Sequence, residues 1–317
     1  AVDARTGMTA QQQLRAIYQE VRNLLPRKDP GYHKLMGKLS KEGVQQLTMS
    51  SLDPEEYQYL QLYFEREIMP LISPQIIDKR QPFPFLKNKE IYVGVNLASK
   101  SGDVRLGIIS SSGLFNRLII LPSAENGVKF VLAEDLICFF AEKVFNKHQV
   151  LEKTIFRITR NADITVDEGL FDFDIDFRGV MEEMLKKRRR LDVVRLQFSS
   201  RPGDRLSAFL CKKLKVEDDC FSIQSIPLDF SFGFALPSAL DPHKEQKNWY
   251  YREAKPFVPV DFAKGDAGGA INYLKNHDML LSFPFQSTKP FVDLLYEAGD
   301  DPSVLSIKIS LYRLANH

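Results

Sequence analysis

The feature of this sequence that most constrains its fold is an abrupt change of composition at Met69-Pro70. The twenty residues 70–89, PLISPQIIDKRQPFPFLKNK, contain four prolines. They cannot form a continuous helix, because proline lacks the backbone N–H that an internal helical turn requires. Helical patterns precede this connector and strand patterns follow it, so we predict an α+β protein with more than one domain.

Composition sets outer limits on the function. The 317 residues are 44% hydrophobic and 26% charged, which is typical of soluble proteins with two or three domains. A net charge of +2 argues against a nucleic-acid-binding surface. We expect no transmembrane segment, because no apolar run is long enough, and we find no signal peptide.

The cysteines and histidines do not form a recognisable metal or redox motif. The three cysteines have no CxxC spacing, and Cys138 and Cys211 lie in apolar helical patterns. We therefore predict that both are small core residues in a reducing cytoplasm. The five histidines are scattered, so we expect no histidine-built metal site.

Residues 1–70 are predicted to be helical, as the remnant of a helical N-terminal domain. Thr9 begins a helix with a capping box to Gln12, and Pro26 is expected to end it. A turn at residues 29–31 should separate it from a second helical piece. A third helix is predicted to begin at Pro54, because Asp53 is a suitable cap and proline suits the first helical position.

Residues 71–255 are predicted to form one mixed α+β middle domain. Its helices are expected at 134–145 and 204–214, and residues 227–265 are expected to be irregular. The expected strands are runs of β-branched and aliphatic residues, at 91–97, 104–110, 118–121, 128–132, 154–163, 193–198 and 221–226.

Two basic features of this middle part invite a phosphate-binding interpretation. Arg157 and Arg160 belong to the strand at 154–163, but their side chains should point to opposite faces. We therefore favour a structural role, in which they pair with Asp163, Asp167 or nearby acids. The basic run 186–190 ends a segment with an acidic start, as in an ordinary surface helix, although a polyanion-binding patch is the alternative.

The last stretch, Asp278 to Arg313, is predicted to form a βαβ unit. Its strands are expected at 279–283 and 304–311, and its helix should be capped by Ser287 or Thr288 and carry Pro290 in its first turn. One face of the final strand carries Lys308, and Arg313 follows its carboxyl end. Ligands of open α/β sheets gather at such ends, so an anion site and a merely solvated strand end are both compatible with this pattern.

Three separated stretches resemble the bacterial polyphosphate kinases of the long, multidomain type. They are PFPFLKN at 82–88, FRITRNAD at 156–163, and LLSFPFQSTKPFVDLL with DPSVLSIKISLYR near the end. In the last stretch the matching positions are Leu280, Leu281, Pro284, Phe285, Asp301, Pro302, Val304, Ile307, Lys308, Leu311, Tyr312 and Arg313.

The resemblance implies a domain order and a reaction. Residues 256–317 would be a linker and the first βαβ unit of a phospholipase D-like α/β catalytic domain. The enzyme would reversibly transfer the terminal phosphate of ATP to inorganic polyphosphate through a phosphohistidine. That histidine lies in an HxK element further along the family's sequence, so no catalytic residue is expected within this chain, and the isolated chain should be inactive.

The resemblance also implies ligands and partners. Arg313 matches the arginine that the family assigns to the Mg²⁺ and phosphate region, and Lys308 is a weaker phosphate-binding candidate. Because a guanidinium has no lone pair for a metal, Arg313 is expected to reach Mg²⁺ only through phosphate oxygens. ATP, ADP and polyphosphate are the expected partners, with a homo-oligomer formed through the middle domain. The expected location is the cytoplasm, with a peripheral position at the inner membrane as the alternative.

Two other functions are also compatible with the sequence. The middle domain has no catalytic constellation, so it can be a protein–protein module for oligomer assembly. A phospholipase D-like nuclease or lipid transferase would share only the downstream fold. Both ends of the chain also look truncated, since it begins at Ala1 and stops four residues after the final predicted strand unit.

Overall fold

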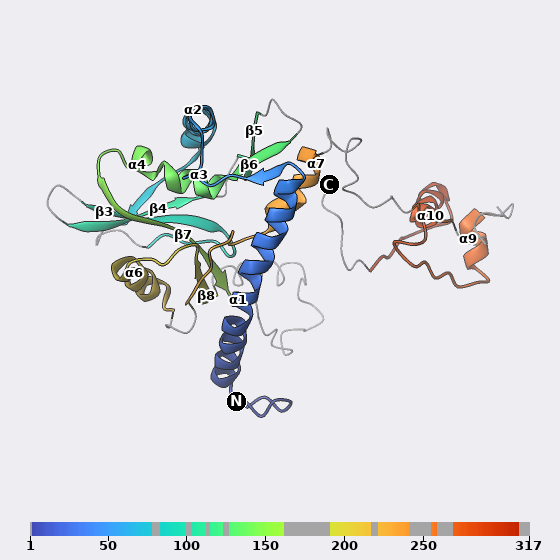
Figure 1. The fold of residues 1–317 in the computed structure, drawn as a ribbon. Helices are drawn as coiled ribbons and strands as arrows, with labels where there is room; N and C mark the ends of the chain where they lie inside the picture. Colours follow the sequence, from blue (N-terminus) through green and yellow to red (C-terminus); the bar gives the residue numbers. More distant parts are fainter. Residues whose placement is uncertain are drawn as a thin grey trace. The chain divides into compact units, whose positions relative to one another are not determined.

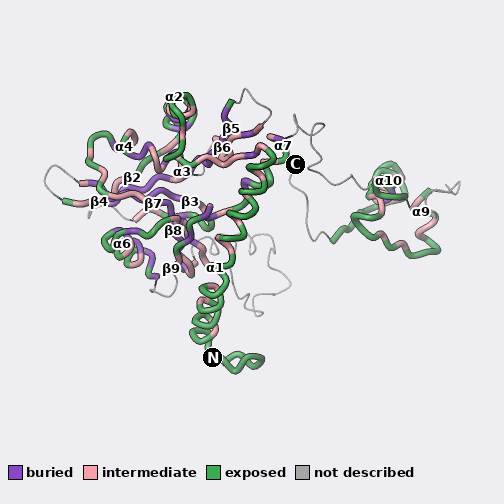
Figure 2. Tube along the Cα trace, viewed as in Figure 1, coloured by how far each residue is buried: buried purple, intermediate pink, exposed green. Residues whose placement is uncertain are grey.

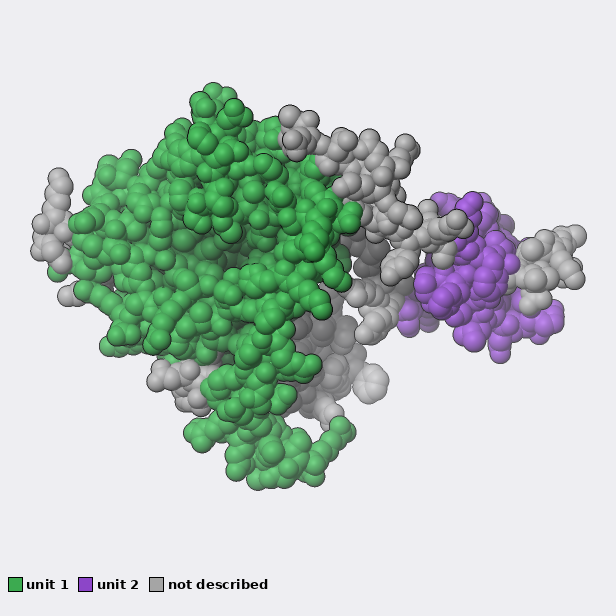
Figure 3. Space-filling model, in the orientation of Figure 1, with its two compact units in different colours: residues 1–246 green, residues 247–317 purple. Residues whose placement is uncertain are grey.

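The computed structural model describes residues 2–77, 83–98, 103–111, 115–122, 127–161, 191–216, 221–240, 255–258 and 269–310 (Figure 1). The chain divides into two compact units, residues 1–246 and residues 247–317 (Figure 3). Helices and mixed sheets occur together in the first unit, so the predicted α+β class is confirmed.

Helix α1 (Ala10–Lys41) begins as predicted. The Thr9 hydroxyl accepts a hydrogen bond from the Gln12 N–H, and the Gln12 side chain accepts one from the Thr9 N–H at 2.8 Å. The predicted stop at Pro26 and the predicted turn at residues 29–31 are wrong, because Pro26 and Pro30 both lie inside one helix of 32 residues.

Contacts with the rest of the unit hold α1 on both sides of Pro26. Before this proline, the Tyr18 hydroxyl donates to the Val194 carbonyl at 2.6 Å. After it, the Lys28 ammonium donates to the Gln224 amide oxygen at 3.1 Å. A proline in a helix interior costs about 3 kcal/mol. These contacts offset that cost, which the local sequence pattern does not reveal.

Helix α2 (Pro54–Tyr63) confirms the third predicted start. The Asp53 carboxylate accepts a hydrogen bond from the Glu56 N–H at 2.8 Å. The Glu56 carboxylate accepts one from the Asp53 N–H at 3.0 Å. The helix continues into a π turn η1 (Phe64–Ile68) and a 3₁₀ turn η2 (Met69–Leu71), which bring the chain to the proline-rich connector.

The strands form two sheets. The three-stranded sheet has the order β1-β6-β5 and the six-stranded sheet has the order β2-β4-β3-β7-β8-β9. Most predicted strands are present, and those at 104–110, 118–121, 128–132 and 193–198 have the predicted bounds. The strands are β1 (Val44–Gln46), β2 (Gln75–Ile77), β3 (Ile91–Ala98), β4 (Val104–Ser110), β5 (Leu118–Leu121), β6 (Val128–Leu132), β7 (Gln149–Arg160), β8 (Val193–Phe198) and β9 (Phe221–Ile223).

The six-stranded sheet is covered on both faces, as the buried segments in Figure 2 show. One face packs against α2 and against α3 (Ala133–Phe139) and α4 (Ala141–Val144), which together replace the single helix predicted at 134–145. The other face packs against α6 (Asp204–Leu214), whose Leu206 and Leu210 are fully buried. Successive side chains of β7 point to opposite faces of the sheet, so Ile155 packs in the first core and Phe156 in the second.

The segment after β9 is less irregular than predicted. It contains the 3₁₀ turn η5 (Ser231–Phe234) and the short helix α7 (Leu236–Leu240). Trp249, the basic run 186–190 and the acids Asp163 and Asp167 lie outside the described residues.

The second unit contains α9 (Gly269–Leu274) and α10 (Lys289–Asp300). The predicted helix with Pro290 in its first turn is confirmed. The strand predicted at 279–283 is wrong, as is the described part, 304–310, of the strand predicted at 304–311. These residues have no ladder partner among the described residues, and the side chain of Leu305 is 97% exposed. Apolar alternation alone does not form a strand, because a strand needs a paired backbone.

Candidate functional site

Of the two predicted ligand residues, the structure describes one. Lys308 lies in the unpaired segment that follows α10, and its side chain is exposed. Arg313 lies outside the described residues.

The backbone that leads to Lys308 is organised by Asp301, at the end of α10. Its carboxylate accepts hydrogen bonds from the Ser303 hydroxyl at 2.6 Å and the Ser303 N–H at 2.8 Å. These hydrogen bonds hold the pKa of Asp301 below its ordinary value. The Val304 N–H also donates to the Asp301 carbonyl, so the chain leaves the helix in a defined turn.

Glu297 connects the two helices of this second unit. Its carboxylate accepts from the N–H groups of Ala270 at 2.7 Å and Ile271 at 3.2 Å, and so caps α9 from the side of α10. Gly269 permits this approach, because its φ is +75° and a Cβ there would collide with the Glu297 carboxylate.

One pocket of the first unit, of about 510 Å³, is lined by α1, α3, β7 and the segment before η5. Burial and ion pairing shape the chemistry of several of its side chains. Burial and the neighbouring Glu134 charge raise the pKa of Asp135 to about 7, and burial raises that of the Cys138 thiol to about 12. Lys153 is bound by Glu142 at 2.9 Å. The pocket is suited to binding rather than to nucleophilic chemistry.

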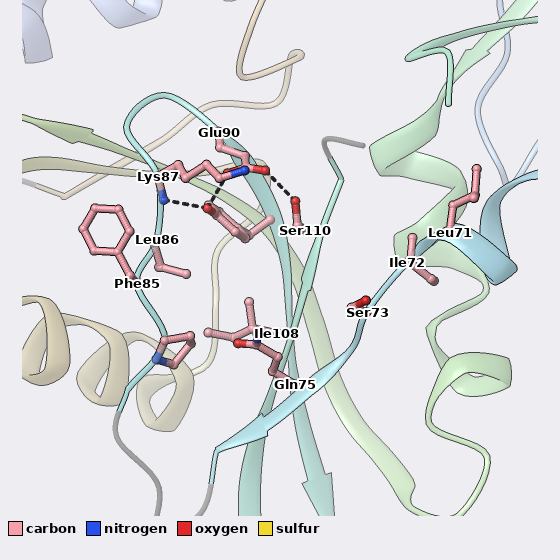
Figure 4. A pocket seen from close by; sticks show the side chains of 12 residues that line it. Leu71, Ile72, Ser73, Gln75, Phe85, Leu86, Lys87, Glu90, Ile108 and Ser110 are labelled. Carbon is pink, nitrogen blue, oxygen red and sulfur yellow. Dashed lines mark hydrogen bonds and ion pairs between the residues drawn. The ribbon is translucent and has the colours of Figure 1, made fainter. Parts of the chain in front are cut away.

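A second pocket, of about 420 Å³, lies beside β2, β3 and β4 and is drawn in Figure 4. Glu90 accepts from the Ser110 hydroxyl at 2.6 Å and from the Tyr92 hydroxyl at 2.7 Å. The Lys87 N–H donates to the same tyrosine oxygen. Burial and the bond to Glu90 raise the pKa of Tyr92, so this closed network offers no free acid or base.

The two arginines of β7 have structural contacts. Arg157 donates to the carbonyls of Lys89 and Leu228 and to the Asp229 carboxylate. Arg160 donates to the carbonyls of Leu86 and Leu191 and lies over the Phe85 ring. These contacts agree with the structural role predicted for both arginines.

The acid that pairs with Arg157 is Asp229, which the sequence did not indicate. Asp229 also accepts from Arg117 at 2.9 Å, and Arg117 is bidentate to the buried Glu134. Burial opposes ionisation of Asp229, but the bonds from Ser231 and the charges of Arg157 and Arg117 outweigh it and lower its pKa. No local signal predicts pairs between residues 72 and 112 positions apart.

The described residues do not supply a site for Mg²⁺. No three of their His, Cys, Asp and Glu side chains gather as metal ligands, and Lys308 is a cation. The described residues therefore do not fit the ion that the resemblance implies. Among the helices of the described part of the chain, none has the length and hydropathy to span a membrane.

Comparison with known proteins assigns the two units to successive parts of one family. Residues 55–236 match the family described as polyphosphate kinase middle domain, and residues 269–317 match polyphosphate kinase C-terminal domain 1. The polyphosphate kinase of Bacillus cereus is 36% identical over 319 residues, which cover 98% of this chain and 44% of that protein. That of Halalkalibacterium halodurans is 32% identical, with 98% and 44% covered.

A solved structure agrees with this assignment at the level of the fold. The crystal structure of polyphosphate kinase from Porphyromonas gingivalis superposes with a TM-score of 0.63 at 18% identity, covering 92% of this chain and 42% of that one. The chain thus spans less than half the length of the relatives it matches. The match over residues 55–236 covers more than half of this chain, and the chain belongs to the polyphosphate kinase family.

Proposed function

We propose that this chain is part of an enzyme that reversibly transfers the terminal phosphate of ATP to inorganic polyphosphate through a phosphohistidine. The observation that carries the proposal is the pair of successive family matches, at residues 55–236 and 269–317. The histidine and most nucleotide contacts belong to parts of the enzyme outside residues 1–317. Within the proposal, residues 1–70 are the end of a helical domain, 71–255 an interaction domain and 256–317 the start of a phospholipase D-like catalytic domain.

In this enzyme, Arg313 and Lys308 bind phosphate oxygens. Phosphoryl transfer spreads negative charge over the oxygens of the transferring group, and positioned cations stabilise that charge. A guanidinium offers two parallel N–H donors, which suit a phosphate better than a metal. Mg²⁺ would contact the same phosphate from ligands outside the described residues. The exposed side chain of Lys308 is free to reach such a ligand.

A phosphorylation experiment tests this mechanism. Full-length enzyme incubated with ATP labelled on its terminal phosphate should carry an acid-labile label on a histidine outside residues 1–317. The isolated chain of residues 1–317 should take up no label and make no polyphosphate. Labelling within residues 1–317, or turnover by the isolated chain, would contradict the proposal.

A second function is favoured for the middle part of the chain. Among the described residues between 71 and 240, Glu90 and Glu134 of the two pockets are each held by hydrogen bonds, and neither is bonded to a histidine or a cysteine. We propose that this part forms the homo-oligomer of a cytoplasmic enzyme. Light scattering after size-exclusion chromatography of the 317-residue chain should give at least a dimeric mass at high protein concentration. A strict monomer would contradict the proposed oligomer.

A further inference from the structure

One face of the six-stranded sheet carries basic side chains beneath α1. In the β7–β8 ladder Arg157 pairs with Gln197 and Thr159 with Arg195, so the two arginines lie diagonally on one face. Gln197 in turn pairs with Ser222 of β9. Lys28 reaches the same region from α1, since its ammonium donates to Gln224 and lies 4.5 Å from the centre of the Phe230 ring.

The positive charge of this cluster is incompletely balanced. Arg157 and Arg117 share Asp229, and Arg117 also binds Glu134, so two carboxylates balance these two arginines and the unbalanced charges are those of Lys28 and Arg195. Lys28 donates to a neutral amide. The guanidinium of Arg195 has no hydrogen-bond or ion-pair partner among the described residues.

The pKa values report the same imbalance. Burial lowers the pKa of Lys28, and the charge of Arg195 lowers it further, although Asp29 acts in the opposite direction. Burial and the charge of Arg157 lower the pKa of Arg195. Cations that depress one another's pKa values favour an anion between them.

Three buried polar atoms at this place have no partner among the described residues. They are Asp29 Oδ1, Ser222 Oγ and Gln224 Nε2, and the Gln224 side chain is 1% exposed. Leaving such an atom unpaired destabilises the folded protein. The other oxygen of Asp29 is already bound by the Ser225 hydroxyl and N–H. The set therefore lacks an acceptor for the serine, amide and guanidinium donors, and a donor for Asp29.

We propose that Lys28, Arg195, Ser222, Gln224 and Asp29 form a binding site for a singly protonated phosphate group. Its unprotonated oxygens accept from Lys28, Arg195, Ser222 and Gln224. Its one P–OH donates to Asp29 Oδ1. This hydrogen bond gives the Asp29 carboxylate a role in a site that is otherwise basic. The inference does not rest on the proposed phosphotransfer, because it uses only residues of the first unit and no family match.

Titration calorimetry on the whole chain, at constant ionic strength, tests the site with three probes. Inorganic phosphate should bind more tightly than sulfate, which has the same shape but no proton to donate at neutral pH. Tripolyphosphate distinguishes the two sources of a phosphate group. If it binds more tightly than inorganic phosphate, the site takes the end of a polyphosphate chain. If it binds equally or more weakly, the site takes the free phosphate ion. Equal affinities for phosphate and sulfate would overturn the proposal.

Three variants sharpen the test. Arg195→Gln should weaken phosphate binding about tenfold or more, as expected for one charge-assisted contact. Arg205→Gln, at an exposed arginine of α6, is the matched control and should bind as wild type. Asp29→Asn should reverse the selectivity, because an amide N–H then faces the site and sulfate can accept from it.

A thermal melt distinguishes a binding arginine from a structural one. In phosphate-free buffer Arg195→Gln should melt at or above the wild-type temperature, because it removes a repulsion with Arg157. At one phosphate concentration, phosphate should raise the wild-type midpoint by more than it raises that of the variant. A variant that melts lower but binds phosphate as wild type would show that Arg195 is structural, and would overturn the proposal.

Discussion

Asp229 Oδ2 accepts a hydrogen bond from Arg157 Nη2 at 2.7 Å, across 72 positions of the chain. The other oxygen of Asp229 accepts from Arg117 at 2.9 Å. Arg157 belongs to β7 of the six-stranded sheet, and Arg117 directly precedes β5 of the three-stranded sheet. One carboxylate therefore connects both sheets through the segment after β9.

Replacing this carboxylate should destabilise the first unit. Asp229→Ala leaves two half-buried guanidinium groups without their shared anion, and we expect a loss of about 2 kcal/mol, below the range for a fully buried pair because Asp229 is 22% exposed. Urea unfolding followed by circular dichroism measures it. The control Glu65→Ala removes a surface ion pair with Lys143 and should leave the midpoint near wild type. Equal midpoints for both variants would contradict this role.

The stability of the first unit should fall as the pH rises from 4 toward 7. The pKa of Asp135 is raised from 3.8 to about 7, so the folded protein favours the neutral acid. Between the unfolded and folded pKa values, charging Asp135 costs up to about 1.4 kcal/mol per pH unit, and the cost is constant above pH 7. Asp135→Asn should remove this part of the decline. Parallel pH profiles of wild type and variant would show that burial does not raise this pKa.

Two glycines of the second unit should respond to alanine with opposite signs. Gly269→Ala forces a side chain into left-handed backbone and against Glu297, and should destabilise the helix pair by at least about 1 kcal/mol. Gly299→Ala, in open space within α10, should stabilise it by about 0.5–1 kcal/mol. Hydrogen exchange of the α9 and α10 amides measures both effects. Slower exchange in Gly269→Ala would contradict the capping by Glu297, and faster exchange in Gly299→Ala would contradict the open helical position of Gly299.

Local signals predicted the elements that depend on local physics. Asp53 with Pro54 specifies a helix start, and the runs of β-branched and aliphatic residues in β4, β5 and β6 favour strands that the sheets bury. Pro26 failed as a stop signal because distant contacts of α1 offset its local cost. The segment at 304–310 failed as a strand because a ladder depends on a partner that the segment itself does not encode.

The candidate sites show the same division. The resemblance identified the family and the carried-over Arg313, whereas the Asp229 network and the basic face beneath α1 became visible only from strand register. Arg195 shows why, since nothing in its own strand indicates that Arg157, Lys28 and Ser222 lie around it. Pairings across such separations are set by the fold as a whole.

Activity of the full-length enzyme with Arg313→Ala tests the central claim most directly. Wild type should convert ATP to ADP with matching synthesis of polyphosphate. The variant should lose about 100-fold or more in kcat/KM, as for other groups that stabilise transition-state charge. Lys308→Met should lose less. Polyphosphate synthesis by Arg313→Ala at the wild-type rate would contradict the proposed role of Arg313 in phosphate binding. No synthesis by wild type would contradict the proposed polyphosphate kinase activity.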